Sequence, residues 1–267
     1  MTKIAIIGAA GRMGQALLRC ASSMPGLQVV AAVEQAGSPL AGKDPGLFAG
    51  IGETGLRVTT DLATAVRAAD VVIDFSFHEV VPQTARLAAQ YGRAMVLGTT
   101  GLAPDERATV EQASKTVPIV WAPNMSLGVN LLFALVQQAG KALGVEYDVE
   151  IVEAHHRFKR DAPSGTALRL GEKVAEGRGQ TFKDVAVFGR EGLGGERPRG
   201  EIGIHAVRAA DIIGDHTVLF ATDGERVEIS HRATSRDAFA KGALRAAGWL
   251  PGRAPGLYDM QDVLGLK

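Results

Sequence analysis

The chain has 267 residues, of which 46% are hydrophobic and 22% charged, and its 29 acidic residues balance its 29 basic ones. This length suits one large domain or two ordinary ones, and a net charge of zero argues against nucleic acid as a partner. A single cysteine, Cys20, excludes an intrachain disulfide and a cysteine-rich metal site. No apolar run approaches the roughly 18 residues of a membrane-spanning helix. The apolar run at the N-terminus is shorter than a signal-peptide core, so we expect a cytoplasmic protein.

Short apolar runs alternate with helical patterns in the first part of the chain. The runs are almost continuously hydrophobic, which is typical of parallel strands covered by helices on both faces. The expected strands are Lys3–Gly8, Gln28–Val33, Asp70–Phe75, Ala94–Leu97 and Pro118–Trp121. The expected helices are Gly11–Ser23, Leu62–Ala68, Glu79–Tyr91 and Pro104–Ser114. This alternation predicts an α/β fold with a doubly wound parallel sheet of the Rossmann type.

After Asn124 the alternation of strands and helices becomes irregular. The elements expected next are a helix Ser126–Leu143, a strand Tyr147–Ala154, a helix Ser164–Glu176, a long mobile glycine-rich loop Gly189–Gly203, and strands Glu201–Val207, His216–Ala221 and Arg226–Ser230. Asp223 and Gly224, between the last two strands, are a signal for a tight hairpin. These elements predict a second, α+β domain with a mixed or largely antiparallel sheet.

The apolar face of a last helix, Asp237–Leu250, predicts that the chain returns to pack on the first domain. We therefore place the first domain at residues 1–125 with 236–267, and the second at residues 126–235. The small sheet of the second domain needs cover on its other face. A matching sheet from another subunit would supply it, which favours a homo-oligomer.

A glycine-rich turn joins the first strand to the first helix. Gly8, Gly11 and Gly14 have the spacing G-x-x-G-x-x-G, which lets a pyrophosphate approach backbone N–H groups at a helix N-terminus. Glu34, 20 residues after Gly14, ends the second strand, where a carboxylate accepts hydrogen bonds from ribose hydroxyls. The alternatives are glycines that only make a tight turn and a solvated carboxylate at a strand end. Together the two features favour a dinucleotide site.

The residues around Glu34 also bear on the choice of dinucleotide. Glu34 would repel a 2′-phosphate and the next residue, Gln35, is not a cation, although Arg12 could offset part of the repulsion. We expect NADH to be favoured and NADPH to be accepted. Two further loops follow strand ends, Gly98–Gly101 and Ala122–Met125, and both suit the nicotinamide half, although each could equally be an ordinary turn.

The segment EAHHRFKRDAPSGTA, residues 153–167, concentrates titratable groups at a strand end beside the start of a helix. His155 can carry a proton near neutral pH, and Lys159 can supply a charge or a proton. Ser164 can cap the helix, and the N–H groups of Gly165 and Thr166 are donors for a carboxylate. The alternative interpretations are surface or core histidines, a plain N-cap and a solvated basic face. The remaining histidines are scattered, so no metal site is expected.

The same segment closely resembles the active-site segment of bacterial dihydrodipicolinate reductases. The resemblance extends through GAAGRMG, Glu34, GTTG, APNMSLGVN and GDHTVLFATDGERVEISHRATSR. It implies reduction of 4-hydroxy-tetrahydrodipicolinate, a cyclic dicarboxylate, to tetrahydrodipicolinate with loss of water, in lysine and diaminopimelate biosynthesis. It also implies a homotetramer formed through the sheets of the second domain. Gln35 departs from the family, because several members have a basic residue at this position.

The resemblance assigns a role to each candidate residue. His155 would be the proton donor and acceptor, Lys159 a proton donor, and the second domain would bind substrate and form the oligomer. Substrate would be bound by His156, Gly165 and Thr166, with Ser164 beside them. The cofactor would be lined by Gly8, Ala9, Ala10, Gly11, Arg12, Met13, Glu34, Gly98, Thr99, Thr100, Ala122, Pro123, Asn124 and Met125.

Two other classes of protein have a similar domain order. A semialdehyde dehydrogenase needs a thiol nucleophile, and Cys20, the only thiol, lies inside the first expected helix. This class is therefore excluded. A non-catalytic sensor of nicotinamide nucleotides needs no proton donors in its second domain. It would bind NADH and consume none, so consumption of NADH distinguishes it from a reductase.

Overall fold

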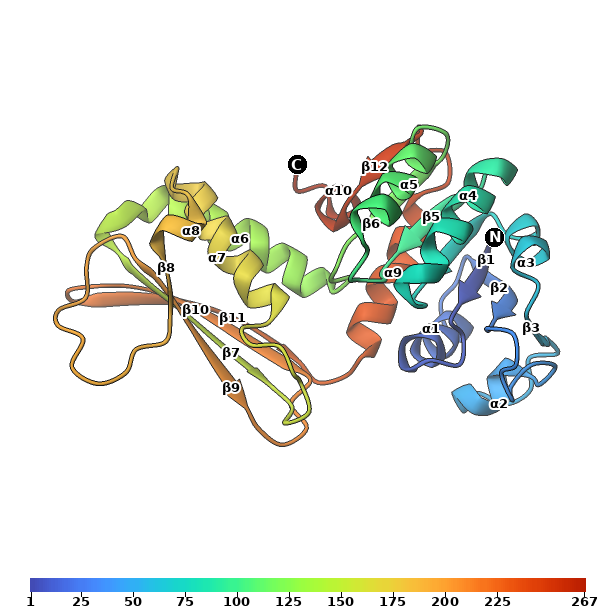
Figure 1. Ribbon diagram of the computed structural model, residues 1–267, viewed down its shortest axis with the longest axis horizontal. Helices are drawn as coiled ribbons and strands as arrows, with labels where there is room; N and C mark the ends of the chain where they lie inside the picture. Colours follow the sequence, from blue (N-terminus) through green and yellow to red (C-terminus); the bar gives the residue numbers. More distant parts are fainter. The chain divides into compact units, whose positions relative to one another are not determined.

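The computed structural model describes all 267 residues, which divide into two compact units. Unit 1 comprises Met1–Leu127 and Arg236–Lys267, and unit 2 comprises Gly128–Ser235. Figure 1 shows both units and the course of the chain through them. None of the helices combines the length and hydrophobicity needed to span a lipid bilayer.

Unit 1 is built on a seven-stranded sheet in the order β12-β6-β5-β4-β1-β2-β3, and every pairing is parallel. The strands are β1 (Thr2–Ile7), β2 (Leu27–Val33), β3 (Val58–Thr59), β4 (Val71–Asp74), β5 (Ala94–Leu97), β6 (Pro118–Trp121) and β12 (Gly256–Tyr258). The strand order reverses between β1 and β4, and ligands of such sheets bind beyond the carboxyl ends of the strands at that point. The predicted doubly wound parallel sheet is confirmed.

Helices cover both faces of this sheet (Figure 1). They are α1 (Arg12–Ser22), α2 (Pro45–Ala49), α3 (Leu62–Ala68), a 3-10 turn η1 (His78–Val80), α4 (Val81–Tyr91), α5 (Pro104–Ser114), α9 (Asp237–Trp249) and α10 (Met260–Leu264). On β1, Ile4 and Ile6 join the core formed with α1 and α9, whereas Ala5 and Ile7 join the core formed with α3. Burial of both faces explains why this strand is hydrophobic throughout. The last long helix, α9, belongs to unit 1 and packs in the core that contains β1 and α1.

Unit 2 contains a mixed five-stranded sheet in the order β11-β10-β7-β9-β8. Its strands are β7 (Asp148–His155), β8 (Ala186–Phe188), β9 (Ile202–Arg208), β10 (Gly214–Thr222) and β11 (Glu225–Ala233), and its helices are α6 (Leu127–Leu143), a 3-10 turn η2 (Gly144–Glu146), α7 (Gly165–Arg178) and α8 (Phe182–Val185). β10 is antiparallel to β7 and β11, whereas β9 is parallel to β7 and β8. The helices lie on one face of the sheet (Figure 1), where Val149 and Ile151 of β7 pack against them.

The shortest elements are those that the sequence pattern does not predict. β3 has two residues, and β8 and β12 have three each, which is too few for a period to be recognised. The expected loop Gly189–Gly203 is also too long, because Ile202 and Gly203 already belong to β9. Within this loop Arg197 is held by Glu150, at 3.0 Å, and by the carbonyl oxygen of Glu201, at 2.7 Å.

Candidate active site

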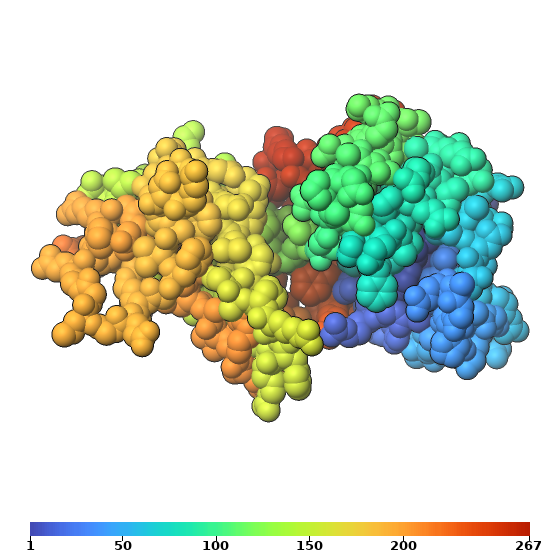
Figure 2. Space-filling view, in the orientation of Figure 1, coloured from blue at the N-terminus to red at the C-terminus, as the bar shows by residue number.

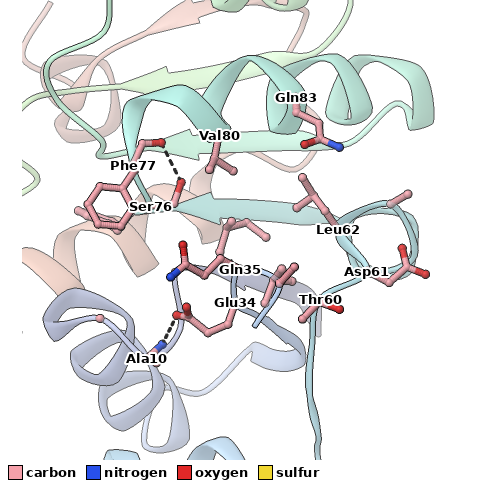
Figure 3. Close-up of a pocket in the computed structure, with 17 residues that line it drawn as sticks. Ala10, Glu34, Gln35, Thr60, Asp61, Leu62, Ser76, Phe77, Val80 and Gln83 are labelled. Carbon is pink, nitrogen blue, oxygen red and sulfur yellow. Dashed lines mark hydrogen bonds between the residues drawn. The ribbon is translucent and has the colours of Figure 1, made fainter. Parts of the chain in front are cut away.

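A cavity of about 760 Å³ lies at the carboxyl ends of β1, β2 and β4 in unit 1. One side is formed by the glycine turn after β1, and Figure 3 shows Glu34 and Gln35 beside it, opposite Ser76, Phe77 and Val80. The position matches the reversal of strand order between β1 and β4. The cavity is therefore where an α/β sheet of this kind binds its ligand.

The glycine turn has the shape needed to cradle a phosphate group. Gly8 has φ +77°, and a Cβ atom there would lie 2.9 Å from the carbonyl oxygen of Phe75. A Cβ atom on Gly14 would lie 2.2 Å from the carbonyl oxygen of Gly8. Gly11 is the N-cap of α1, and no side chain of this residue accepts a hydrogen bond from the first N–H groups of the helix. Those groups and the helix dipole are available to an anion, so the turn fits the pyrophosphate of a dinucleotide.

The acidic residue beside the turn is fixed in position. Oε1 of Glu34 accepts a hydrogen bond from the backbone N–H of Ala10 at 2.7 Å (Figure 3). The cavity lining contains Glu34 and Asp61 but no lysine or arginine. The charged side chains that line this cavity are therefore both acidic.

A smaller cavity of about 260 Å³ lies at the ends of β5 and β6. Thr99, Thr100 and Pro123, all predicted cofactor residues, line it together with Trp121. The Asp74 carboxylate, fully buried at the end of β4, accepts hydrogen bonds from the N–H of Ser76 at 2.9 Å and the hydroxyl of Thr99 at 3.1 Å. Burial raises the pKa of Asp74. Asp74 thus ties the loop after β4 to the loop after β5.

The other predicted cofactor residues lie in the turn after β1, at the start of α1 and in the loops after β5 and β6. The side chains of Ala9, Ala122 and Met125 are buried in the core. Gly98 has no room for a side chain, since a Cβ atom would lie 2.2 Å from the Phe75 ring. Arg12 and Met13 open α1, and the side chain of Asn124 accepts a hydrogen bond from Ser126.

In unit 2 the histidine at the end of β7 is paired with a buried carboxylate. Nδ1 of His155 lies 2.6 Å from Oε2 of Glu153, whose side chain is fully buried. Arg208 of β9 donates to both oxygens of Glu153 at 2.8 Å, and the N–H of Ser164 donates to Oε1 at 2.9 Å. Burial acts to raise the pKa of Glu153, but the bonds from His155, Arg208 and Ser164 outweigh it and lower the pKa to about 2. The carboxylate is therefore ionised and acts only as an acceptor.

The start of α7 adjoins the Glu153–His155 pair. Ser164 caps α7 through its hydroxyl, which accepts from the N–H of Ala167 at 3.2 Å and lies 3.2 Å from Nε2 of His216. The His216 ring meets the His155 ring edge-on, with ring centroids 5.2 Å apart. Burial, together with the charge of His155, lowers the pKa of His216 to about 3, so His216 is neutral. The predicted capping role of Ser164 agrees with this geometry.

The loop between β7 and α7 carries the remaining candidate residues. Nζ of Lys159 pairs with the carboxylate of Asp161 at 2.9 Å. His156 is half-buried, and Phe158 beside it is 80% exposed. In Figure 2 this loop is the yellow-green projection below the rest of unit 2. His155, Lys159 and the first N–H groups of α7 therefore belong to one connected loop and helix start.

Several residues of both sites were missed by sequence reasoning. In unit 1 they include Thr60, Asp61, Phe77 and Gln83 of the larger cavity. Phe77 lies in the loop that follows the carboxyl end of β4, and a residue at that position is a signal of a ligand site. In unit 2 they are Glu153, Arg208 and His216. Glu153 lies on the same helix-covered face of β7 as Val149 and Ile151. A carboxylate at a strand position where the alternation predicts a hydrophobic side chain is a signal of a buried polar site.

The Rossmann sheet, its glycine turn and the cluster of titratable side chains in unit 2 are typical of an oxidoreductase that uses a nicotinamide nucleotide. The family model described as "Dihydrodipicolinate reductase, N-terminus" matches residues 2–125, and the one described as "Dihydrodipicolinate reductase, C-terminus" matches residues 128–264. The chain belongs to the dihydrodipicolinate reductase family.

Relatives from two bacteria are similar over the full chain. The 4-hydroxy-tetrahydrodipicolinate reductase of Anaeromyxobacter dehalogenans (strain 2CP-C) is 55% identical over 267 residues, which are 100% of this chain and 99% of the relative. That of Hahella chejuensis is 52% identical over 100% of both chains. The activity is therefore the NAD(P)H-dependent reduction of 4-hydroxy-tetrahydrodipicolinate in lysine and diaminopimelate biosynthesis.

Solved structures agree on the fold. A dihydrodipicolinate reductase from Paenisporosarcina sp. TG-14, bound to dipicolinate, has a TM-score of 0.77 at 23% identity and covers 98% of each chain. An amine dehydrogenase from Mycobacterium smegmatis has a TM-score of 0.61 at 14% identity, with 96% of this chain and 94% of that chain covered. At these identities the likeness concerns the fold alone.

Proposed function

We propose that unit 1, essentially residues 1–125 with 236–267, binds the dinucleotide, and that unit 2, residues 126–235, binds the dicarboxylate and supplies the proton. The observation that carries this proposal is that the same carboxylate, Glu153, bonds both His155 and the N-terminus of α7. A proton donor and an anion-binding helix start are thus held together. The cytoplasmic location expected from the sequence stays a prediction.

The dicarboxylate requires at least two anion-binding groups. Gly165 and Thr166 are the first two residues of α7, directly after its cap Ser164. Their N–H groups would bind one carboxylate of the substrate. Lys159 and His156, on the preceding loop, would bind the remaining polar groups of the substrate. The titratable candidates are near one another in the chain because a single loop carries them.

The bound nicotinamide nucleotide supplies the hydride. His155 and Lys159 supply the proton that neutralises the charge left on the ring after reduction. Nδ1 of His155 is engaged by Glu153, so Nε2 is the nitrogen that faces the reaction. The proposal is tested by assaying NADH oxidation with freshly generated 4-hydroxy-tetrahydrodipicolinate. If His155 and Lys159 had no part in the reaction, variants in which they are replaced would retain turnover.

The lining of the larger cavity supports a preference for NADH. We expect Gln35→Arg to raise the ratio of kcat/KM for NADPH to that for NADH roughly 10-fold, because a guanidinium would pair with the 2′-phosphate. Steady-state kinetics with both cofactors would measure this ratio. Gln35→Met, which removes the amide without adding charge, is the matched control. A ratio that stays the same in Gln35→Arg would contradict the preference.

The face of the unit 2 sheet opposite the helices supports a homotetramer. Val152 of β7 and Val207 of β9 are 37% and 44% exposed on this face, although both are hydrophobic. We expect Val152→Lys to reduce the mass measured by light scattering, because a buried lysine would face the partner sheet. Val227→Lys on β11 should leave the mass unchanged, since Val227 pairs with the core-facing Phe220 and lies on the other face. An unchanged mass for Val152→Lys would refute this interface.

A further inference from the structure

The buried carboxylate of Glu153 has more hydrogen bonds than a structural ion pair between two side chains requires. Its Oε2 accepts from Nδ1 of His155 at 2.6 Å and Nη1 of Arg208 at 2.8 Å. Its Oε1 accepts from Nη2 of Arg208 at 2.8 Å and from the N–H of Ser164 at 2.9 Å. The four bonds come from three separate segments of unit 2. We propose that Glu153 is a positioning residue, which fixes His155 with Nε2 as its reacting atom and aligns it with the start of α7.

The first step of the argument is the tautomer of His155. A carboxylate can only accept, so Nδ1 of His155 must carry a hydrogen toward Glu153. Nε2 is then the atom that gives and takes the catalytic proton. The structure leaves space beside it, since a Cβ atom on Gly214 would lie 3.1 Å from Nε2. This inference rests on the proposed role of His155 as the proton donor.

The second step concerns what keeps Glu153 ionised. An isolated buried carboxylate would take up a proton and could then no longer hold the imidazole as an acceptor. Arg208 prevents this with two hydrogen bonds in a planar, bidentate arrangement. Nη2 of Arg208 also donates to the carbonyl oxygen of Asp161 at 2.6 Å. Asp161 in turn pairs with Lys159, so Arg208 connects the carboxylate to the loop that carries the lysine.

The third step is the bond to Ser164. Through Oε1, Glu153 fixes the residue that caps α7, and the next N–H groups are those proposed to bind a substrate carboxylate. The distance between the proton donor and the anion site is thus set by one side chain. Misplacing either group by a fraction of an ångström lowers the rate, because proton transfer needs hydrogen-bond distance.

Three charged or titratable side chains lie around His155. They are Glu153 from β7, Arg208 from β9 and His216 from β10. The charge of Lys159 also contributes to lowering the pKa of His216. In Glu153→Gln the negative charge beside Nδ1 is lost, and the amide oxygen that replaces the carboxylate is a weaker acceptor. An imidazolium without its anionic partner releases its proton more easily, so the high-pH limb of the kcat profile should move to lower pH.

The experiment compares Glu153→Gln with Glu172→Gln, which removes an exposed carboxylate of α7 and leaves Arg169 paired with Glu176. We expect kcat of Glu153→Gln to fall roughly 100-fold, with a higher KM and a shifted pH limb, and Glu172→Gln to behave as wild type. Nitrogen NMR of labelled histidine should show hydrogen on Nδ1 of His155 in wild type and a smaller population of this tautomer in Glu153→Gln, because an amide oxygen accepts less strongly than a carboxylate. Wild-type kcat, profile and tautomer in Glu153→Gln would overturn the proposal.

A second variant keeps the proposal testable if Glu153→Gln fails to fold. Gly214→Ala leaves Glu153 and Arg208 in place but crowds Nε2 of His155, so kcat should fall several-fold while the thermal unfolding midpoint changes little. A variant with unchanged kcat would contradict Nε2 as the reacting atom. Failure of the proposed function can be distinguished from failure of this inference. If His155 were not the proton donor, His155→Asn would retain turnover. The tautomer of His155 measured by NMR would still show whether Glu153 orients the ring.

Discussion

His155→Asn is expected to lower kcat by roughly 100- to 10,000-fold, which is the range that positioned proton donors contribute. Asparagine has a similar size but cannot carry a proton near neutral pH. The dissociation constant for NADH should not change, because the dinucleotide cavity belongs entirely to unit 1. Steady-state turnover and equilibrium titration with NADH measure the two effects separately.

Lys159→Met is the companion variant, and we expect a fall in kcat as well as an increase in KM, since Lys159 is proposed both to donate a proton and to bind the substrate. Lys173→Met is its control. It removes a lysine from α7 that pairs with Glu176, outside the proposed site. Near-wild-type kcat in Lys159→Met would remove the lysine from the mechanism, and the same result in His155→Asn would remove the histidine.

Acidification is the second condition with a large expected effect, and His216 is the cause. The pKa of His216 is lowered from 6.5 to about 3 in the folded protein. Between these values the unfolded chain binds a proton that the folded chain does not, so the free energy of unfolding falls as the pH falls. The stability is complete above about pH 6.5 and is lost progressively toward pH 3. From pH 7 to pH 4 the loss is roughly 3 kcal/mol.

Glu153 adds a second loss at lower pH. Its pKa is lowered from 4.5 to about 2, so its contribution is present above pH 4.5 and disappears as the pH falls through 2. The two pH ranges overlap, and the loss due to His216 begins at the higher pH. Urea titrations at several pH values, followed by hydrogen exchange of the β7 and β10 amides, report on unit 2 specifically.

His216→Gln tests the assignment, because glutamine can keep a polar contact with Ser164 but does not titrate. We expect this variant to lose little stability between pH 7 and pH 5, where wild type becomes less stable. His205→Gln, on strand β9, should retain the wild-type slope, since His205 pairs with Glu150 on the opposite face of the sheet. A wild-type slope in His216→Gln would show that another group is responsible.

The sequence predicts those parts of the fold that depend on local pattern. β1 is recognisable because both of its faces are buried, and the start of α7 because Ser164 is a good N-cap before Gly165. β3 and β12 are not recognisable, because they are strands only through their pairing with β2 and β6. Their few residues carry no period of their own.

The same distinction explains the candidate site. His155 and Lys159 share one loop and are found by inspection. Arg208 is 53 residues from His155, yet parallel pairing of β7 with β9 sets the two in register. His216 is opposite Glu153 through the antiparallel pairing of β10 with β7. Register depends on the assembled sheet, so the groups that orient the histidine could not be predicted from spacing.

The most direct test of the central claim is a single-turnover measurement of NADH oxidation. Wild-type enzyme and His155→Asn would each be loaded with NADH, in excess over freshly generated 4-hydroxy-tetrahydrodipicolinate, and the NADH absorbance followed after mixing. We predict rapid loss of NADH in wild type and a rate at least about 100-fold lower in His155→Asn, with equal NADH binding. Equal rates in the two proteins would contradict the assignment of proton transfer to His155.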